Sequence, residues 1–221
     1  MEKVKISINK LGEYLTANPS RRKRIIKDQK NPKGFIVVRY KDARNALIDF
    51  FVKGEGDKKY IEAKIRDIID KTAQSKLMEQ DKNLSIEALE LFQLSNISLD
   101  LENQKVISDS VKTRIDIKGV SVSVFPDVII HGLDKGKPFI GAIKLHFSKG
   151  NRLNTNSGSY VSTMLRMYLE AKYPKVRINL KYCVAIDVFD AKAYCASSSW
   201  KMRKRHLEDA CEEIKLMWPH I

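Results

Sequence analysis

The length, composition and charge of the chain already exclude several classes of protein. Its 221 residues are 43% hydrophobic, enough to bury a core without the disulfide or metal staples of a mini-protein. The formal net charge of +14 implies an anionic partner, and 16 Lys and Arg against 7 Asp and Glu fall within residues 1–60. Because solubility alone does not require such local concentration, we expect nucleic acid to be that partner.

Cysteine usage and hydropathy indicate the compartment. Cys183, Cys195 and Cys211 are odd in number and lack the CxxC spacing of zinc or redox sites. A reducing compartment fits best, so we expect a cytoplasmic protein. No run approaches the roughly 18 apolar residues of a membrane span, so we expect no membrane partner.

The densest basic run predicts a short helix near the N-terminus. Asn18 and Pro19 are typical of a helix N-cap and first helical position, and Asn31-Pro32 predicts the end of the helix. This helix displays four cations that we assign to nucleic-acid binding: Arg21, Arg22, Arg24 and Lys27. A solvated helix face is the alternative.

Apolar residues at helical spacing continue to about residue 94. Those from Val38 to Phe51 predict a helix that ends at Gly54, and a second set from Ile61 to Ile69 predicts another helix. Ser85 is a cap candidate for a short third helix over "SIEALELFQL". We therefore expect a helical, basic N-terminal region over residues 1–83.

The pattern then changes to that of a mixed sheet. The segments "TRIDIKGVSVSVFPDVII", "KPFIGAIKLHFS" and "KYCVAIDVFDAKAYCA" are rich in Val and Ile and predict β structure, with a turn at Asp190. Helical spacing in "GSYVSTMLRMYLEAKYP" predicts a helix between the second and third, and "SWKMRKRHLEDACEEIKLMW" predicts a final helix. We expect an α/β fold with a mixed β-sheet core flanked by helices.

One predicted hairpin carries a charge in each arm. With the turn centred near Asp134-Lys135, Asp127 would lie opposite Ala142 and share its face of the sheet with Lys144. Val128 and the other alternate residues would then form the opposite, core-directed face. A slip of one residue would reverse the faces of one arm.

These residues resemble the signature of the PD-(D/E)xK nuclease superfamily. Pro126-Asp127 corresponds to "PD" and Ala142-Ile143-Lys144 to "(D/E)xK", in a helix–β-β-β–α–β order similar to the common core of the superfamily. The resemblance covers about residues 84–196 and implies a restriction-endonuclease-like fold over residues 84–221. It implies Asp127 as a ligand of Mg²⁺ or Mn²⁺, the Ile143 backbone carbonyl as another, and Lys144 as the catalytic cation.

The departure from this signature is at Ala142, which cannot bind a metal. Either another acid points into the same site or the site no longer cleaves. The candidate replacement ligands are Glu87, Glu90, Asp116 and Asp187.

A second basic run opens the predicted final helix and could also contact phosphates. It contains Lys201, Arg203, Lys204 and Arg205.

Three functions remain open at this stage. The first is a metal-dependent nuclease that hydrolyses phosphodiester bonds, with DNA favoured over RNA as the substrate. The second is a catalytically inactive nucleic-acid-binding subunit of the same fold within a larger assembly. The third is a basic scaffold protein that contacts RNA or protein, with Asp127 and Lys144 forming only a structural ion pair.

Overall fold

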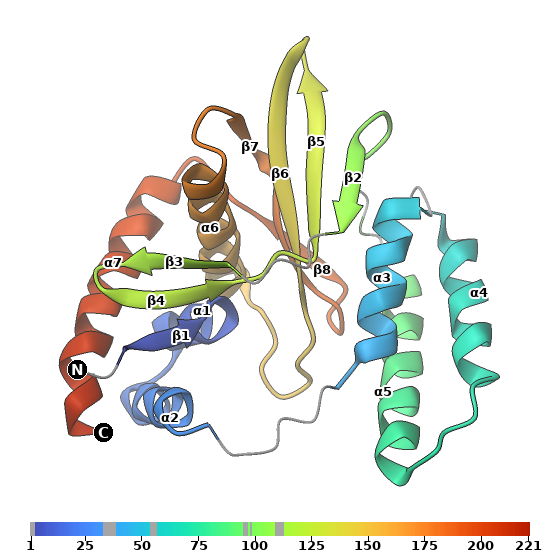
Figure 1. Ribbon diagram of the computed structural model, residues 1–221, viewed down its shortest axis with the longest axis horizontal. Coiled ribbons are helices and arrows are strands. Elements are labelled where there is room, and N and C mark those ends of the chain that lie inside the picture. The colour runs from blue at the N-terminus through green and yellow to red at the C-terminus, as the bar shows by residue number, and fades with distance from the viewer. Residues whose placement is uncertain (1–2, 33–38, 54–56, 95–96, 98, 109–112) are drawn as a thin grey trace.

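The computed structural model describes residues 3–32, 39–53, 57–94, 97, 99–108 and 113–221. Strands and helices form a mixed α/β fold, as predicted (Figure 1). The expectations placed on Val38 and Gly54 lie outside the described residues.

The helices are α1 (Ile8–Thr16), α2 (Pro19–Lys30), α3 (Lys41–Lys53), α4 (Lys58–Ile69), α5 (Lys76–Gln93), α6 (Thr155–Lys172) and α7 (Trp200–Met217), followed by the 3-10 turn η1 (Trp218–His220). The Asn18 side chain caps α2 by accepting a hydrogen bond from the Arg21 N–H at 2.9 Å, which confirms the predicted start of that helix. The two helices predicted after residue 150 are confirmed as α6 and α7.

Five strands form the larger sheet in the order β2-β5-β6-β7-β8. They are β2 (Lys105–Ser108), β5 (Val128–Asp134), β6 (Lys137–His146), β7 (Arg177–Asp187) and β8 (Lys192–Cys195). β6 and β7 run parallel, joined by α6 as crossover, and the other neighbours are antiparallel. The sheet is therefore mixed, as expected.

A smaller sheet crosses beside the larger one (Figure 1). It has the order β1-β4-β3 and consists of β1 (Lys5–Ser7), β3 (Thr113–Ile117) and β4 (Val120–Val124). β1 pairs in parallel with β4, so the N-terminal segment adds a strand to residues more than a hundred positions away.

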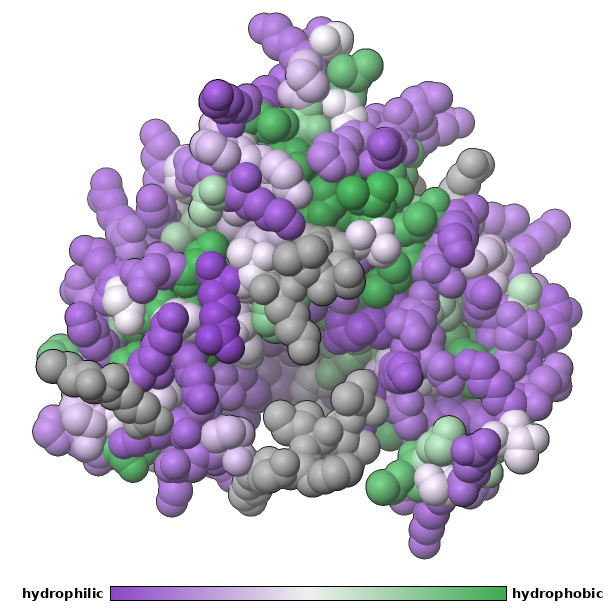
Figure 2. All heavy atoms as spheres, in the orientation of Figure 1, coloured by the Kyte–Doolittle hydropathy of each residue, from purple (hydrophilic) through white to green (hydrophobic). Residues whose placement is uncertain are grey.

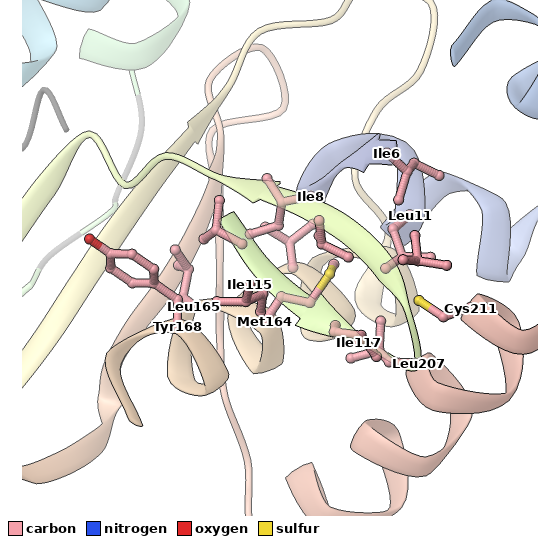
Figure 3. Close-up of a cluster of buried hydrophobic side chains, with 14 of the residues drawn as sticks. Ile6, Ile8, Leu11, Ile115, Ile117, Met164, Leu165, Tyr168, Leu207 and Cys211 are labelled. Carbon is pink, nitrogen blue, oxygen red and sulfur yellow. The ribbon is translucent and has the colours of Figure 1, made fainter. Parts of the chain in front are cut away.

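Both faces of the five-stranded sheet are buried, because alternate side chains enter two separate cores. Ile129, Ala142 and their neighbours on one face pack in a core with α1, α6, α7 and the smaller sheet. Figure 3 shows part of this core, where Ile6, Leu11 and Cys211 come from β1, α1 and α7. Val128 and Ile143 belong to the opposite face, which packs against α3, α4 and α5. Each fully buried side chain contributes about 1.5–3 kcal/mol.

Three sequence expectations need correction. Ser85 does not cap a short helix; it lies buried inside α5, which Ser75 caps. β1 and β2 were not predicted, because runs of three and four residues are too short to show a period. The proposed boundary after residue 83 falls inside α5, and the first 83 residues divide between the two cores.

The described helices include none that is long and apolar enough to cross a membrane.

Gly158 in α6 sets how closely that helix approaches β8. A Cβ there would stand 2.4 Å from Cγ of Tyr194, whose hydroxyl donates to the Leu153 carbonyl at 2.8 Å. Although alanine favours a helix by about 1 kcal/mol, we expect Gly158→Ala to lose about 1–3 kcal/mol through overpacking. Urea unfolding would measure this loss.

The matched control is Asn156→Ala, an exposed position in the same turn of α6. It should be close to neutral. A gain in stability for Gly158→Ala would contradict this packing argument.

Candidate functional site

Asp127 lies at the junction of the two sheets, directly before β5. Its backbone N–H donates to the Ile143 carbonyl at 2.8 Å, and Val128 pairs with Ile143. Asp127 therefore stands beside Lys144, and Ala142 pairs with Ile129 instead. The expected register was wrong by two residues, because the turn is centred on Lys135 and Gly136. A shift of two keeps each residue on its predicted face.

The carboxylate of Asp127 accepts hydrogen bonds from three groups. Lys144 Nζ and the Leu145 N–H reach Oδ2 at 3.0 and 2.8 Å, and an Arg44 guanidinium nitrogen from α3 binds Oδ1. Asp127 and Lys144 are 5% and 7% exposed. The predicted contact between the two charges is confirmed, and both side chains are almost fully shielded from water.

Burial sets the protonation behaviour of Lys144. Loss of hydration lowers the pKa of its ammonium below the ordinary 10.5, and the Asp127 carboxylate opposes this effect. The nearby Arg44 charge lowers this pKa further.

Arg44 is a site residue that the sequence did not reveal. Its guanidinium lies 5.0 Å from the centroid of the Phe147 ring, which stacks on Tyr40 at 5.5 Å. The aromatic contact fixes the guanidinium where it can reach Asp127. Many helices carry an arginine beside their apolar stripe, so nothing in the sequence pointed to Arg44 as a site residue.

Two of the four candidate acids form contacts of their own and do not converge on Asp127. Glu87 on α5 forms an ion pair with Lys149 at 2.5 Å. Asp187, fully buried at the end of β7, accepts from the backbone N–H groups of Leu153, Phe189 and Asp190 at 2.6, 3.0 and 2.9 Å. Asp187 thus organises the turns after β6 and β7.

The other two acids are elsewhere. Asp116 lies in the smaller sheet and accepts from the Gly119 N–H at 2.9 Å, and Glu90 is exposed on α5. The described part of the chain holds no group of three or more His, Cys, Asp or Glu residues that could bind a metal.

His146, next on the same face as Lys144, also has a structural contact. It pairs with Asp187 across β6 and β7, and its Nε2 lies 2.7 Å from the Asn151 carbonyl. Since a carbonyl can only accept, Nε2 is the donor. Burial lowers the pKa of His146 below its ordinary value, which favours the neutral ring.

These donors do not suit Mg²⁺ or Mn²⁺. Hard divalent cations take several oxygen ligands in octahedral geometry. At Asp127 both carboxylate oxygens instead face cationic or N–H donors, the Ile143 carbonyl accepts the Asp127 N–H, and Ala142 supplies no oxygen. The arrangement satisfies a buried ion pair.

The two basic runs lie at opposite ends of α7. Lys30, which ends α2, donates to the Trp218 carbonyl just past the C-terminal end of α7, whereas the second run opens that helix about 27 Å away. Arg21 pairs with Glu13 at 2.5 Å and Arg22 with Glu213 at 3.4 Å. Arg24 and Lys27 are exposed.

In the second run the side chains differ in exposure. Arg203 donates to the hydroxyls of Ser197 and Ser199, which ties it to the start of α7. Lys201 and Arg205 are exposed, and Lys204 is half-buried. Trp200 packs under the Arg166 guanidinium, 3.3 Å from its ring centroid.

A scan against protein-family models found no match, and a search of the curated proteins found none either.

The pairing of Asp127 and Lys144 predicts strong energetic coupling. Asp127→Asn should lose about 3–5 kcal/mol because it leaves Lys144 buried without its partner. Asp127→Asn combined with Lys144→Met should lose less than the sum of the single changes, by about 1–3 kcal/mol. Urea unfolding of the four proteins of this cycle would measure the coupling.

The control cycle is Asp49→Asn with Lys53→Met, an exposed pair on α3 at 3.7 Å. Its coupling should be about 0.3–0.5 kcal/mol. Equal coupling in the two cycles would contradict a specific role for the buried pair.

The lowered pKa of Lys144 also predicts a pH dependence. Between its folded pKa and 10.5 the unfolded chain binds more protons than the folded one, so the free energy of unfolding rises with pH. The stability of the parent relative to Lys144→Met should therefore increase as the pH rises toward 10.5. Urea midpoints at several pH values would measure it.

Lys59→Met, an exposed position on α4, controls for the loss of one positive charge. A parent-to-Lys144→Met difference that is flat over this range would show that burial does not hold the ammonium as described.

Proposed function

We propose that the chain is a nucleic-acid-binding module of PD-(D/E)xK-like fold, in which the Asp127–Lys144 pair stabilises the fold and holds no catalytic metal. The observation that carries this proposal is the saturation of the Asp127 carboxylate by Lys144, Arg44 and the Leu145 N–H. Alanine at position 142, fully buried in the core, leaves no acid to complete a metal site.

The order of elements supports the link to this fold. α5, β2, β5, β6, α6 and β7 follow one another as helix–β-β-β–α–β, with the β3–β4 hairpin inserted after β2. Asp127 precedes the second of these strands and Lys144 lies in the third, which is where the resemblance would put them.

Charge supports a nucleic-acid partner. At +14 the protein should attract polyanions, and each phosphate neutralised releases counterions. We propose DNA as the partner, in the cytoplasm, and membership of a larger assembly that supplies any catalytic activity.

A second candidate function is a metal-dependent nuclease. The observation in its favour is the buried juxtaposition of Asp127 and Lys144, since desolvating two charges is costly and a pure binder does not require it. In that case DNA phosphates would have to supply metal ligands and displace Arg44 from Asp127.

Binding and cleavage assays on the parent and on Lys144→Met separate the two functions. We expect the parent to bind duplex DNA equally in EDTA and in Mg²⁺, with no cleavage, and with an affinity that falls steeply with salt. Lys144→Met should retain the parent affinity, because Lys144 is only 7% exposed.

Fluorescence anisotropy and gel analysis of labelled DNA give both readouts, and calorimetry with Mn²⁺ tests metal binding directly. Metal-dependent cleavage that Lys144→Met abolishes would establish the nuclease instead. Absence of DNA binding by the parent would overturn both candidates and favour a scaffold protein.

A further inference from the structure

The β5–β6 hairpin ends in an arm, residues 133–138, that projects beyond the rest of the fold (Figure 1). Within the described residues, β2 pairs with β5 only as far as His131, and β7 pairs with β6 only from Phe139 onward. The arm is therefore a two-stranded ribbon without a third strand on either side.

The turn at its tip is well defined. Lys135 and Gly136 have φ values of 51° and 74°, the pattern of the two-residue turn that matches the twist of a hairpin. A Cβ at Gly136 would meet nothing within 4 Å, so the tip stands clear of the fold. An ion pair between Asp134, directly before the turn, and Arg177 ties the arm to β7.

Cations dominate the surface of the arm and its base. Lys135, Lys137, Lys175 and Arg177 are exposed, and Asp134, which Arg177 already neutralises, is the acid beside them. Lys175 lies in the turn before β7, two residues from Arg177, which pairs with Phe139 at the base of the arm. Figure 2 shows hydrophilic side chains gathered around this projecting end.

Two apolar side chains interrupt this charge. Leu133 is 65% exposed and lies directly opposite Pro138, which is also exposed. Leu133 keeps most of its surface in water, so it contributes little to the stability of the fold. A ribbon with cations around an apolar pair can contact phosphates and the interior of a groove at once.

We propose that the β5–β6 arm enters the major groove of B-form DNA, an inference that rests on the proposed function. Strands about 4.8 Å apart form a ribbon that fits a groove about 12 Å wide. Lys135, Lys137 and Lys175 contact phosphates along the groove, and Leu133 with Pro138 contacts the base edges.

The width of the ribbon also lets the arm distinguish DNA from RNA. The major groove of A-form RNA is deep and too narrow for a ribbon. Arg21, Arg22 and Arg203 already bind Glu13, Glu213 and serine hydroxyls within the fold. The lysines of the arm have fewer such contacts.

The test is binding of the full chain to a labelled duplex of DNA, and to double-stranded RNA of the same sequence, across a salt series. Replacing Lys135, Lys137 and Lys175 by Gln should lower affinity for DNA about tenfold or more, and reduce the salt slope by about 0.9 for each phosphate that is no longer neutralised. Leu133→Ala should weaken binding a few-fold at an unchanged salt slope, because an apolar contact releases no counterion.

The control removes the same charge from the α3–α5 helices through Lys53→Gln, Lys59→Gln and Lys76→Gln, all exposed. This variant should keep the parent salt slope. Equal slopes for the arm variant and the parent, or equal parental affinity for DNA and RNA duplexes, would overturn the role of the arm. A parent that binds neither duplex would overturn the proposed function itself, whereas capture of a protein by an arm that ignores DNA would identify a protein-docking arm instead.

Discussion

The buried carboxylate of Asp127 is the constraint on which the arrangement of this fold depends. It lies where the chain leaves the smaller sheet and enters the larger one, and it binds Lys144 and Leu145 of β6 and Arg44 of α3. A charge at such a position is tolerated only when its lone pairs are satisfied. The same bonds therefore fasten the segment between the two sheets to β6 and to α3.

The polar side chains next to this pair also form hydrogen bonds within the fold. On the face of the sheet that carries Lys144, His146 donates to a carbonyl and Asp187 accepts from three N–H groups, so that both side chains are held by the turns. The residues that resemble a catalytic signature in the sequence, Asp127 and Lys144, take part in a hydrogen-bond network in three dimensions. The excess positive charge lies at the surface, where it can attract a polyanion.

Much of the architecture followed from local patterns. Each of three features could be predicted because it depends on a few neighbouring residues: the cap at Asn18, the helix α6, and the alternation through β5 and β6. The pairing of Asp127 with Lys144 was also predictable, since alternation fixes faces even when the register shifts by two residues. The partner of each residue across the hairpin was not, because it depends on positive φ values at Lys135 and Gly136 that lysine rarely adopts.

Residue type and short-range periodicity were enough to predict the fold class, the two charged positions and the absence of an acid at Ala142. Three further features became visible only in three dimensions: Arg44 reaches Asp127, Glu87 and Asp187 bind other groups, and β1 joins β4. The physical reason is that these contacts join segments distant in the chain, and which of several similar acids or cations meets a given partner depends on packing geometry that no local pattern encodes.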